Sequence, residues 1–229
     1  MSGFSRSKRG SVAASGNWLE LDRSPHGIQF YSGEGFLLDS LSRFVSTALE
    51  AGDSCLILAT EAHKDGLAER LKARGVNTDR AAKKGRYVTV DAFQVLAQLI
   101  VGGKLSKTRF DSFIREIVLP LNAAAESKMK RVAVGGEIVG LLWAEGKEEA
   151  AIELERIWNE MAAQGSYCLR CFYPLASFSD PRQNELFLKL CAEHASVIPY
   201  ESHSAPIAEE ERFAELAARV RQLERAGVS

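Results

Sequence analysis

Cysteine and proline are scarce in this sequence, and neither sign of charge dominates. Its 229 residues include only 4 Cys and 6 Pro, and so few cysteines exclude a disulfide scaffold in a chain of this length. Lys and Arg number 29 against 30 Asp and Glu, for a net charge of -1. Because the whole chain has no field that would attract nucleic acid or an anionic membrane, we expect neither as a direct partner.

Long apolar runs are missing as well. No stretch approaches the roughly 18 apolar residues that span a bilayer, and no charged-then-apolar leader opens the chain. Together with the few cysteines, these absences predict a soluble protein of the reducing cytoplasm.

Short apolar runs and longer segments of helical periodicity alternate from residue 26 onward. The expected strands are residues 28–31, 54–60, 86–91, 131–135, 167–173 and 196–200, and the expected helices are 36–51, 62–74, 92–101, 108–127, 147–164 and 183–194. The unbroken apolar character of Ser54–Thr60 suits a strand buried on both faces, and Pro199 places the last strand at an edge. The alternation predicts an α/β fold with three layers, in which helices cover both faces of a mainly parallel sheet.

The chain divides into three expected segments. Residues 1–16 combine Ser and Gly with three basic residues and no acid, which predicts a flexible basic tail. Residues 17–203 form the α/β domain. Residues 204–229 contain an expected amphipathic helix, 208–226, with apolar positions spaced 3, 4, 3. Packing on its own domain and pairing in a homodimer both stay open for this helix, because a convincing coiled coil needs about three or four heptads.

A Gly-containing turn after the first expected strand has the position of a phosphate loop. Ligands of open parallel sheets bind outside the carboxyl ends of the strands, where backbone N–H groups at a helix N-terminus can hold an anion. The segment at residues 30–41, FYSGEGFLLDSL, lacks the GxxxxGK and the following Ser or Thr of such a loop. Glu34 also places a negative charge where the phosphate would bind. The sequence therefore argues against nucleotide hydrolysis.

Aromatic side chains, several of which carry a polar group, lie near the expected strand ends. They suit a pocket for a small, largely apolar molecule. They are His26, Phe30, Tyr31, Tyr87, Trp143, Trp158, Phe172 and Tyr173. Glu137, which follows two glycines, is the most suggestive single residue, because close backbone approach beside a carboxylate often builds a site. Core packing and a pocket stay open as alternatives for the aromatic set.

The four histidines are His26, His63, His194 and His203. They show neither HxxxH nor HExxH spacing, so we expect no metal site. Cys168 and Cys171 form a CxxC within an expected strand, where residues three apart point to opposite faces, and we expect two buried small hydrophobic side chains. No GxSxG or other nucleophile arrangement appears, so we expect no catalytic residue and no cofactor.

Several ordered segments resemble the MEDS domain, a sensory domain named for methanogens, methylotrophs and the DcmR repressor of dichloromethane metabolism. The most specific segments are HGIQFY at 26–31, GRYVTVDA at 85–92, GEIVGLLWAEG at 136–146 and LERIWN at 154–159. The resemblance runs from about residue 25 to residue 203. It implies a fold similar to the RecA/KaiC-like ATPases, with a degenerate phosphate loop.

The resemblance also implies a function. Family members are proposed to sense small molecules, hydrocarbon derivatives among them, and are fused to histidine kinases or DNA-binding regions or stand alone. The family pattern falls on His26, Gln29, Phe30, Tyr31, Asp91, Gly136, Glu137, Trp143, Trp158 and Asn159. Because this sequence shows no kinase, receiver or helix-turn-helix region, we expect its output to pass through a histidine kinase or transcription regulator as partner, or through self-association.

We therefore expect a non-enzymatic sensory domain that binds a small, apolar or hydrocarbon-derived ligand at the carboxyl ends of the strands. The expected ligand-binding residues are His26, Gln29, Phe30, Tyr31, Glu34, Asp91, Gly136, Glu137, Trp143 and Tyr173. Two alternatives stay open: a degenerate KaiC-like nucleotide-binding module with weak ATPase activity, and a protein–protein interaction scaffold in a regulatory pathway.

Overall fold

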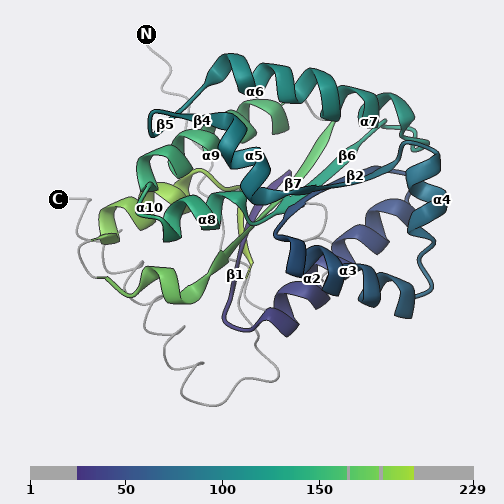
Figure 1. Ribbon diagram of the computed structural model, residues 1–229, viewed down its shortest axis with the longest axis horizontal. Helices are drawn as coiled ribbons and strands as arrows, with labels where there is room; N and C mark the ends of the chain where they lie inside the picture. The colour runs from purple at the N-terminus through teal and green to yellow at the C-terminus, as the bar shows by residue number, and fades with distance from the viewer. Residues whose placement is uncertain (1–24, 164–165, 181–182, 199–229) are drawn as a thin grey trace, which may run out of the picture.

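The computed structural model describes residues 25–163, 166–180 and 183–198 (Figure 1). The expected tail at 1–16, Pro199 and the expected helix 208–226 lie outside the described residues. Six strands form one sheet: β1 (His26–Tyr31), β2 (Ser54–Ala59), β3 (Tyr87–Asp91), β6 (Val132–Gly136), β7 (Tyr167–Pro174) and β8 (Ser196–Ile198). Their order is β3-β2-β6-β7-β1-β8, and every neighbouring pair is parallel. The predicted parallel sheet is confirmed, and its last strand, β8, is an edge strand as expected.

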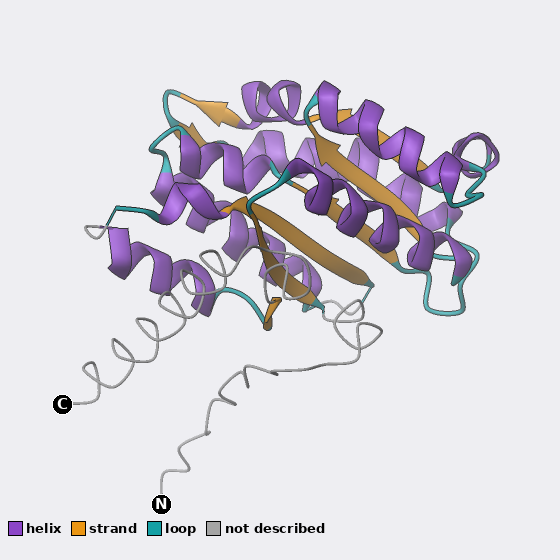
Figure 2. Ribbon diagram, turned by 90° about the horizontal axis from the view of Figure 1, so that it is seen from below, coloured by secondary structure: helices purple, strands orange, loops and turns teal. Residues whose placement is uncertain are grey.

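Helices cover both faces of the sheet, which confirms the predicted layers. One face carries α2 (Glu34–Glu50), α3 (Glu61–Ala73) and α4 (Thr78–Lys83), and the other carries α5 (Ala92–Leu99), α6 (Lys107–Phe113), α7 (Leu119–Ala124), α8 (Ile138–Ala144), α9 (Glu148–Ala162) and α10 (Asn184–Ala192). Figure 1 shows α2 and α3 on one side of the sheet and α8 and α9 on the other, and Figure 2 shows the strands lying between helices.

Alternation along each strand divides the buried apolar side chains between the two faces. In β7, Cys168 and Phe172 face the α2 side, whereas Leu169, Cys171 and Tyr173 face the α9 side. Both cysteines are unbridged and buried. The predicted burial and opposite orientation are therefore confirmed, but Cys171 is not simply a hydrophobic side chain, because its thiol donates to Glu155 Oε2 at 3.2 Å.

The structure differs from the sequence prediction at the start of the first strand, in the helices expected over 92–101 and 108–127, and in two helices, α4 and α8, that were not expected. β1 begins at His26 rather than at residue 28, because His26 and Gly27 pair with β7, a contact that no sequence window contains. The helix expected over 92–101 ends early, because Gly102 and Gly103, at φ 57° and 79°, turn the chain into a hairpin. The hairpin consists of β4 (Ile100–Val101) and β5 (Lys104–Leu105), and the helix expected over 108–127 divides into α6, a π-helical turn at Ile114–Val118 and α7.

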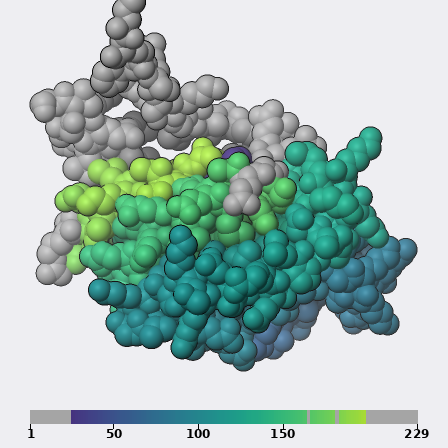
Figure 3. All heavy atoms as spheres, turned by 90° about the horizontal axis from the view of Figure 1, so that it is seen from above, coloured from purple at the N-terminus to yellow at the C-terminus, as the bar shows by residue number. Residues whose placement is uncertain are grey.

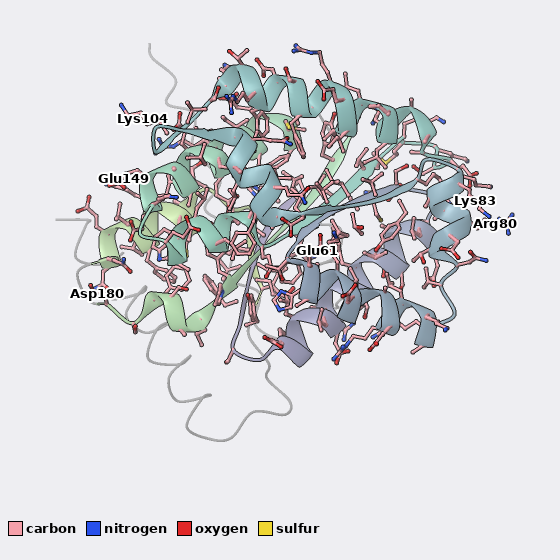
Figure 4. The ribbon with its side chains drawn as sticks, in the orientation of Figure 1. Glu61, Arg80, Lys83, Lys104, Glu149 and Asp180 are labelled. Atoms are coloured by element: carbon pink, nitrogen blue, oxygen red, sulfur yellow. The ribbon has the colours of Figure 1, made fainter. Side chains whose placement is uncertain are left out.

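Charged side chains surround the outside of the domain. Figure 4 shows Arg80, Lys83, Lys104 and Glu149 pointing away from the domain, and all four are exposed. In the space-filling view of Figure 3, the green to yellow residues of the second half of the chain pack directly beside the teal residues of the first half. Within the described ranges, no helix is both long and apolar enough to cross a membrane.

Gly136 ends β6 where the chain passes close to β2. An added Cβ would overlap the carbonyl oxygen of Leu58 and lie 2.8 Å from the Leu58 Cβ. Gly136→Ala is expected to lower the free energy of unfolding, measured with urea, by about 3 kcal/mol, at the upper end of overpacking costs.

Gly35→Ala is the control for this substitution, because its Cβ would meet only the end of Arg70 at 3.9 Å. The expected change in unfolding free energy is within about 1 kcal/mol. Equal losses at the two positions would contradict the close approach of β6 to β2.

Candidate functional site

A buried carboxylate lies at the carboxyl edge of the sheet. Glu137 directly follows β6 and is only 2% exposed. Its backbone N–H donates to the Leu58 carbonyl of β2 at 3.0 Å, and Gly136 lets the two strand ends approach this closely. The neighbouring strand therefore fixes the backbone from which the Glu137 side chain starts.

The N-terminus of α3 supplies the partners of this carboxylate. Glu137 Oε1 accepts a hydrogen bond from the Thr60 N–H at 2.7 Å, and His63 Nδ1 lies 2.8 and 2.9 Å from the two carboxylate oxygens. Thr60 also caps α3, because its hydroxyl accepts from the His63 N–H. The cap and the carboxylate together orient the His63 ring, with Nδ1 carrying the proton that Glu137 accepts.

Tyr31 and Glu34 join this group from β1 and α2. Burial, then the negative charges of Glu137 and Glu34, and a hydrogen bond to Glu137 raise the pKa of the Tyr31 hydroxyl well above its ordinary value. Glu34 Oε1 lies 3.9 Å from His63 Nε2, and the Glu34 side chain is 81% exposed. We call Tyr31, Glu34, His63 and Glu137 the carboxyl-edge cluster.

Three of the expected ligand residues thus meet at one place, but sequence reasoning misses His63. His63 and Glu137 are 74 positions apart, and the pairing of β2 with β6 brings their elements together. The available signal was position alone, since His63 follows the second expected strand.

Asp91 and Gln29 make contacts that account for them within the packed domain. Asp91 ends β3 and accepts from the Gln94 N–H at 2.8 Å, which caps α5. Gln29 is buried, donates to Ser40 Oγ at 3.1 Å and accepts from Arg170 at 3.3 Å. Both side chains therefore have a structural explanation that requires no ligand.

Three of the aromatic residues expected in a pocket form a packed cluster on the α9 side of the sheet, whereas Tyr31, Tyr87 and Phe172 lie on the α2 side. Phe30, Trp143 and Tyr173 are at most 2% exposed. Their ring centroids lie 5.2, 5.0 and 5.7 Å from that of Phe178, which is the spacing of packed aromatic pairs. For these three residues the structure favours the core-packing alternative.

His26 lies apart from the carboxyl-edge cluster. It begins β1, so about 16 Å of strand separates it from Tyr31 at the other end. This corrects the expectation that His26 and Glu137 line one pocket.

A second polar group, which we call the interior cluster, lies between the sheet and α9. It consists of His26, Glu155, Cys171 and His194, and Tyr173 donates to Glu155 Oε1 at 2.8 Å. All four members are buried, and their donor atoms lie within 4.8 Å of one another. Among the described residues, this is the group whose side chains are placed to hold a metal ion.

Comparison with known families gives one match. The profile of the MEDS family, the methanogen/methylotroph, DcmR sensory domain, matches residues 25–188. That range contains the whole carboxyl-edge cluster and every member of the interior cluster except His194. No curated protein and no solved structure gives a significant match to the chain.

The pairing of His63 with Glu137 predicts a pH dependence. Hydrogen bonding to Glu137 is the largest cause that raises the pKa of His63 above its ordinary value of 6.5, and burial opposes it. Because the folded-state pKa exceeds the unfolded one, the pair stabilises the fold below about pH 6.5, and this contribution is lost as pH rises through the folded-state pKa. An NMR titration of the histidine ring should therefore give His63 a midpoint above 6.5.

In Glu137→Gln the His63 midpoint should fall, because the substitution removes the strong hydrogen-bond acceptor and the charge that raise the pKa of His63 most. Glu34→Gln is the control and should lower the midpoint less, since Glu34 is exposed and more distant. A His63 midpoint that Glu137→Gln leaves unchanged would contradict the pairing.

Proposed function

This chain belongs to the MEDS family of sensory domains, which gives it a sensory role, and we propose that it binds a small neutral molecule at the carboxyl-edge cluster. The observation that carries the proposal is the buried Glu137 carboxylate, which lies at the strand ends beside His63 and Tyr31. Open parallel sheets bind their ligands at this edge. We propose that the domain works as a binding switch, without catalysis.

The charges of the cluster select the ligand. Glu34 and Glu137 place two carboxylates where a nucleotide would bring its phosphates, so anions are repelled. The raised pKa of Tyr31 keeps its hydroxyl protonated at neutral pH, where it can donate a hydrogen bond. A short hydrocarbon derivative with one hydrogen-bond acceptor meets these demands, and Phe36 in the same turn as Glu34 adds apolar surface.

Ligand binding at this edge can be transmitted, because the cluster joins β1, α2 and α3 to the end of β6. A ligand that takes the place of Glu137 beside His63 or Tyr31 releases the contact between α3 and the start of α8. The equilibrium between the two arrangements shifts only by the ligand's preference for one of them. We propose that a regulatory protein partner reads this change.

The thermal midpoint of the purified chain tests this function. The panel contains halogenated alkanes, short alcohols, monocyclic aromatics, MgATP and MgGTP. A compound at about 100 times its Kd adds about 2.7 kcal/mol, which raises the midpoint of a domain of this size by about 5 to 10 °C. We expect this shift from one of the neutral classes, and we expect Tyr31→Phe to abolish it, because the ligand then loses the hydroxyl that donates to its acceptor.

Tyr87→Phe is the matched control, because Tyr87 begins β3 and therefore lies at the opposite edge of the sheet. It should leave the shift unchanged. A midpoint raised by MgATP or MgGTP alone would replace this proposal with the nucleotide-binding module. If no compound of the panel raises the thermal midpoint, the result would instead favour the interaction scaffold.

A further inference from the structure

The interior cluster brings four metal-binding side chains to one point from four parts of the chain. His26 comes from β1, Cys171 from β7, Glu155 from α9, and His194 from the turn between α10 and β8. Glu155 is fully buried, and the least buried of the four residues is only 9% exposed. The carboxylate therefore needs compensation from within the domain.

Several distances between these side chains are close to the edges of a metal coordination shell, and all four donor atoms lie within 4.8 Å of one another. His26 Nε2 lies 3.0 Å from Glu155 Oε2 and 3.3 Å from Cys171 Sγ, and Cys171 Sγ lies 3.2 Å from the same oxygen. His194 Nε2 lies 3.4 Å from Glu155 Oε1. Ligands at the usual zinc bond lengths of a tetrahedral site are about 3.3 to 3.8 Å apart. A small contraction or expansion of the cluster would meet this geometry.

Neighbouring groups orient both imidazoles so that Nε2 points at the carboxylate. His26 Nδ1 donates to Asn159 Oδ1 at 2.8 Å, and the Asn159 amide is itself fixed by donating to Glu193. His194 Nδ1 donates to the Leu190 carbonyl at 2.8 Å. With a proton on each Nδ1, each neutral ring directs the lone pair of Nε2 toward Glu155. Metal-binding histidines are oriented in this way by their second nitrogen.

Protons alone satisfy this arrangement poorly. Two neutral imidazoles would direct two lone pairs at an anion whose donors are then only the Cys171 thiol and the Tyr173 hydroxyl, and neither ring would have a donor for its Nε2. Two protonated imidazoles would place two cations in the interior with ring centroids 4.3 Å apart, where they repel. Within the described structure, His194 Nε2 is buried without a hydrogen-bond partner, which is unusual for a buried polar atom.

We propose that His26, Glu155, Cys171 and His194 bind one divalent transition metal ion, zinc being the best fit. One thiolate, one carboxylate and two neutral imidazoles give such an ion a site of zero net charge, which suits the interior. Four protein ligands close the coordination shell, so the ion is structural. It links α9 and the α10–β8 turn to the sheet, on the face opposite the carboxyl-edge ligand site.

The protonation of the cluster changes when the ion binds. In the metal-free protein the Cys171 thiol donates its proton to Glu155 Oε2 at 3.2 Å. A bound cation displaces that proton and stabilises the thiolate. Metal binding therefore releases a proton to solvent.

Cobalt titration of the full chain after chelator dialysis tests the site. Co²⁺ is a spectroscopic substitute for Zn²⁺, and we expect one Co²⁺ per chain, the strong visible bands of a tetrahedral site and a thiolate-to-cobalt charge-transfer band. Zn²⁺ should remove these bands by competition and raise the thermal midpoint. In Asn159→Ala, which frees the His26 ring, Co²⁺ affinity should fall by about tenfold or more.

Cys171→Ser should lose the charge-transfer band, and Cys168→Ser is its matched control. Cys168 is buried three residues away in the same strand but faces the other side of the sheet, so Cys168→Ser should keep the band. Circular dichroism checks that each variant is folded. If Cys171→Ser does not fold, His194→Gln replaces it as the test variant. Folded wild-type protein that binds neither Co²⁺ nor Zn²⁺, or a charge-transfer band that persists in folded Cys171→Ser, would overturn the proposal.

Discussion

Two buried carboxylates, Glu137 and Glu155, determine where this domain carries polar chemistry. An ionised carboxylate in a protein interior is costly unless donors and positive charge surround it. The Glu137 carboxylate accepts hydrogen bonds from the Thr60 N–H and the His63 ring, both at the N-terminus of α3. The Glu155 carboxylate makes polar contacts with side chains from two strands and from the turn after α10. Each carboxylate thus joins elements that are distant in the sequence.

The sheet keeps these two centres apart and gives them different roles. Glu137 lies at the carboxyl edge beside the exposed Glu34 side chain, where we propose that a ligand binds. Glu155 lies between the sheet and α9 and is fully buried, where only an ion or a proton is compensated. A sensory domain needs one site that exchanges its ligand and a framework that keeps its shape, and the two carboxylates meet these needs separately.

The fold could be predicted from the sequence because its signals are local, whereas the sites depend on distant contacts. Apolar runs such as Ser54–Thr60 show a buried strand without knowledge of any neighbour. The partner of Glu137, His63, is 74 positions away, and Cys171 meets His26 across 145 positions. Histidine spacing along the chain therefore gave no indication of the interior cluster, since its two histidines come from different elements. Residue type near strand ends could not separate Trp143, which is core, from Glu137, which anchors a site.

The ionisation of Glu155 tests most directly the claim that a buried carboxylate organises the interior. NMR of the side-chain carboxyl carbon in glutamate-labelled wild-type protein follows it across an acid titration. Burial alone would raise the pKa of Glu155, but the positive charge that His194 and then His26 carry when protonated in acid lowers that pKa below its ordinary value of 4.5. We therefore predict that Glu155 stays ionised below pH 4.5, where a carboxyl group of ordinary pKa is already protonated. A Glu155 carboxyl that is protonated at neutral pH would contradict this account, because an uncharged group requires neither the two histidines nor a metal ion.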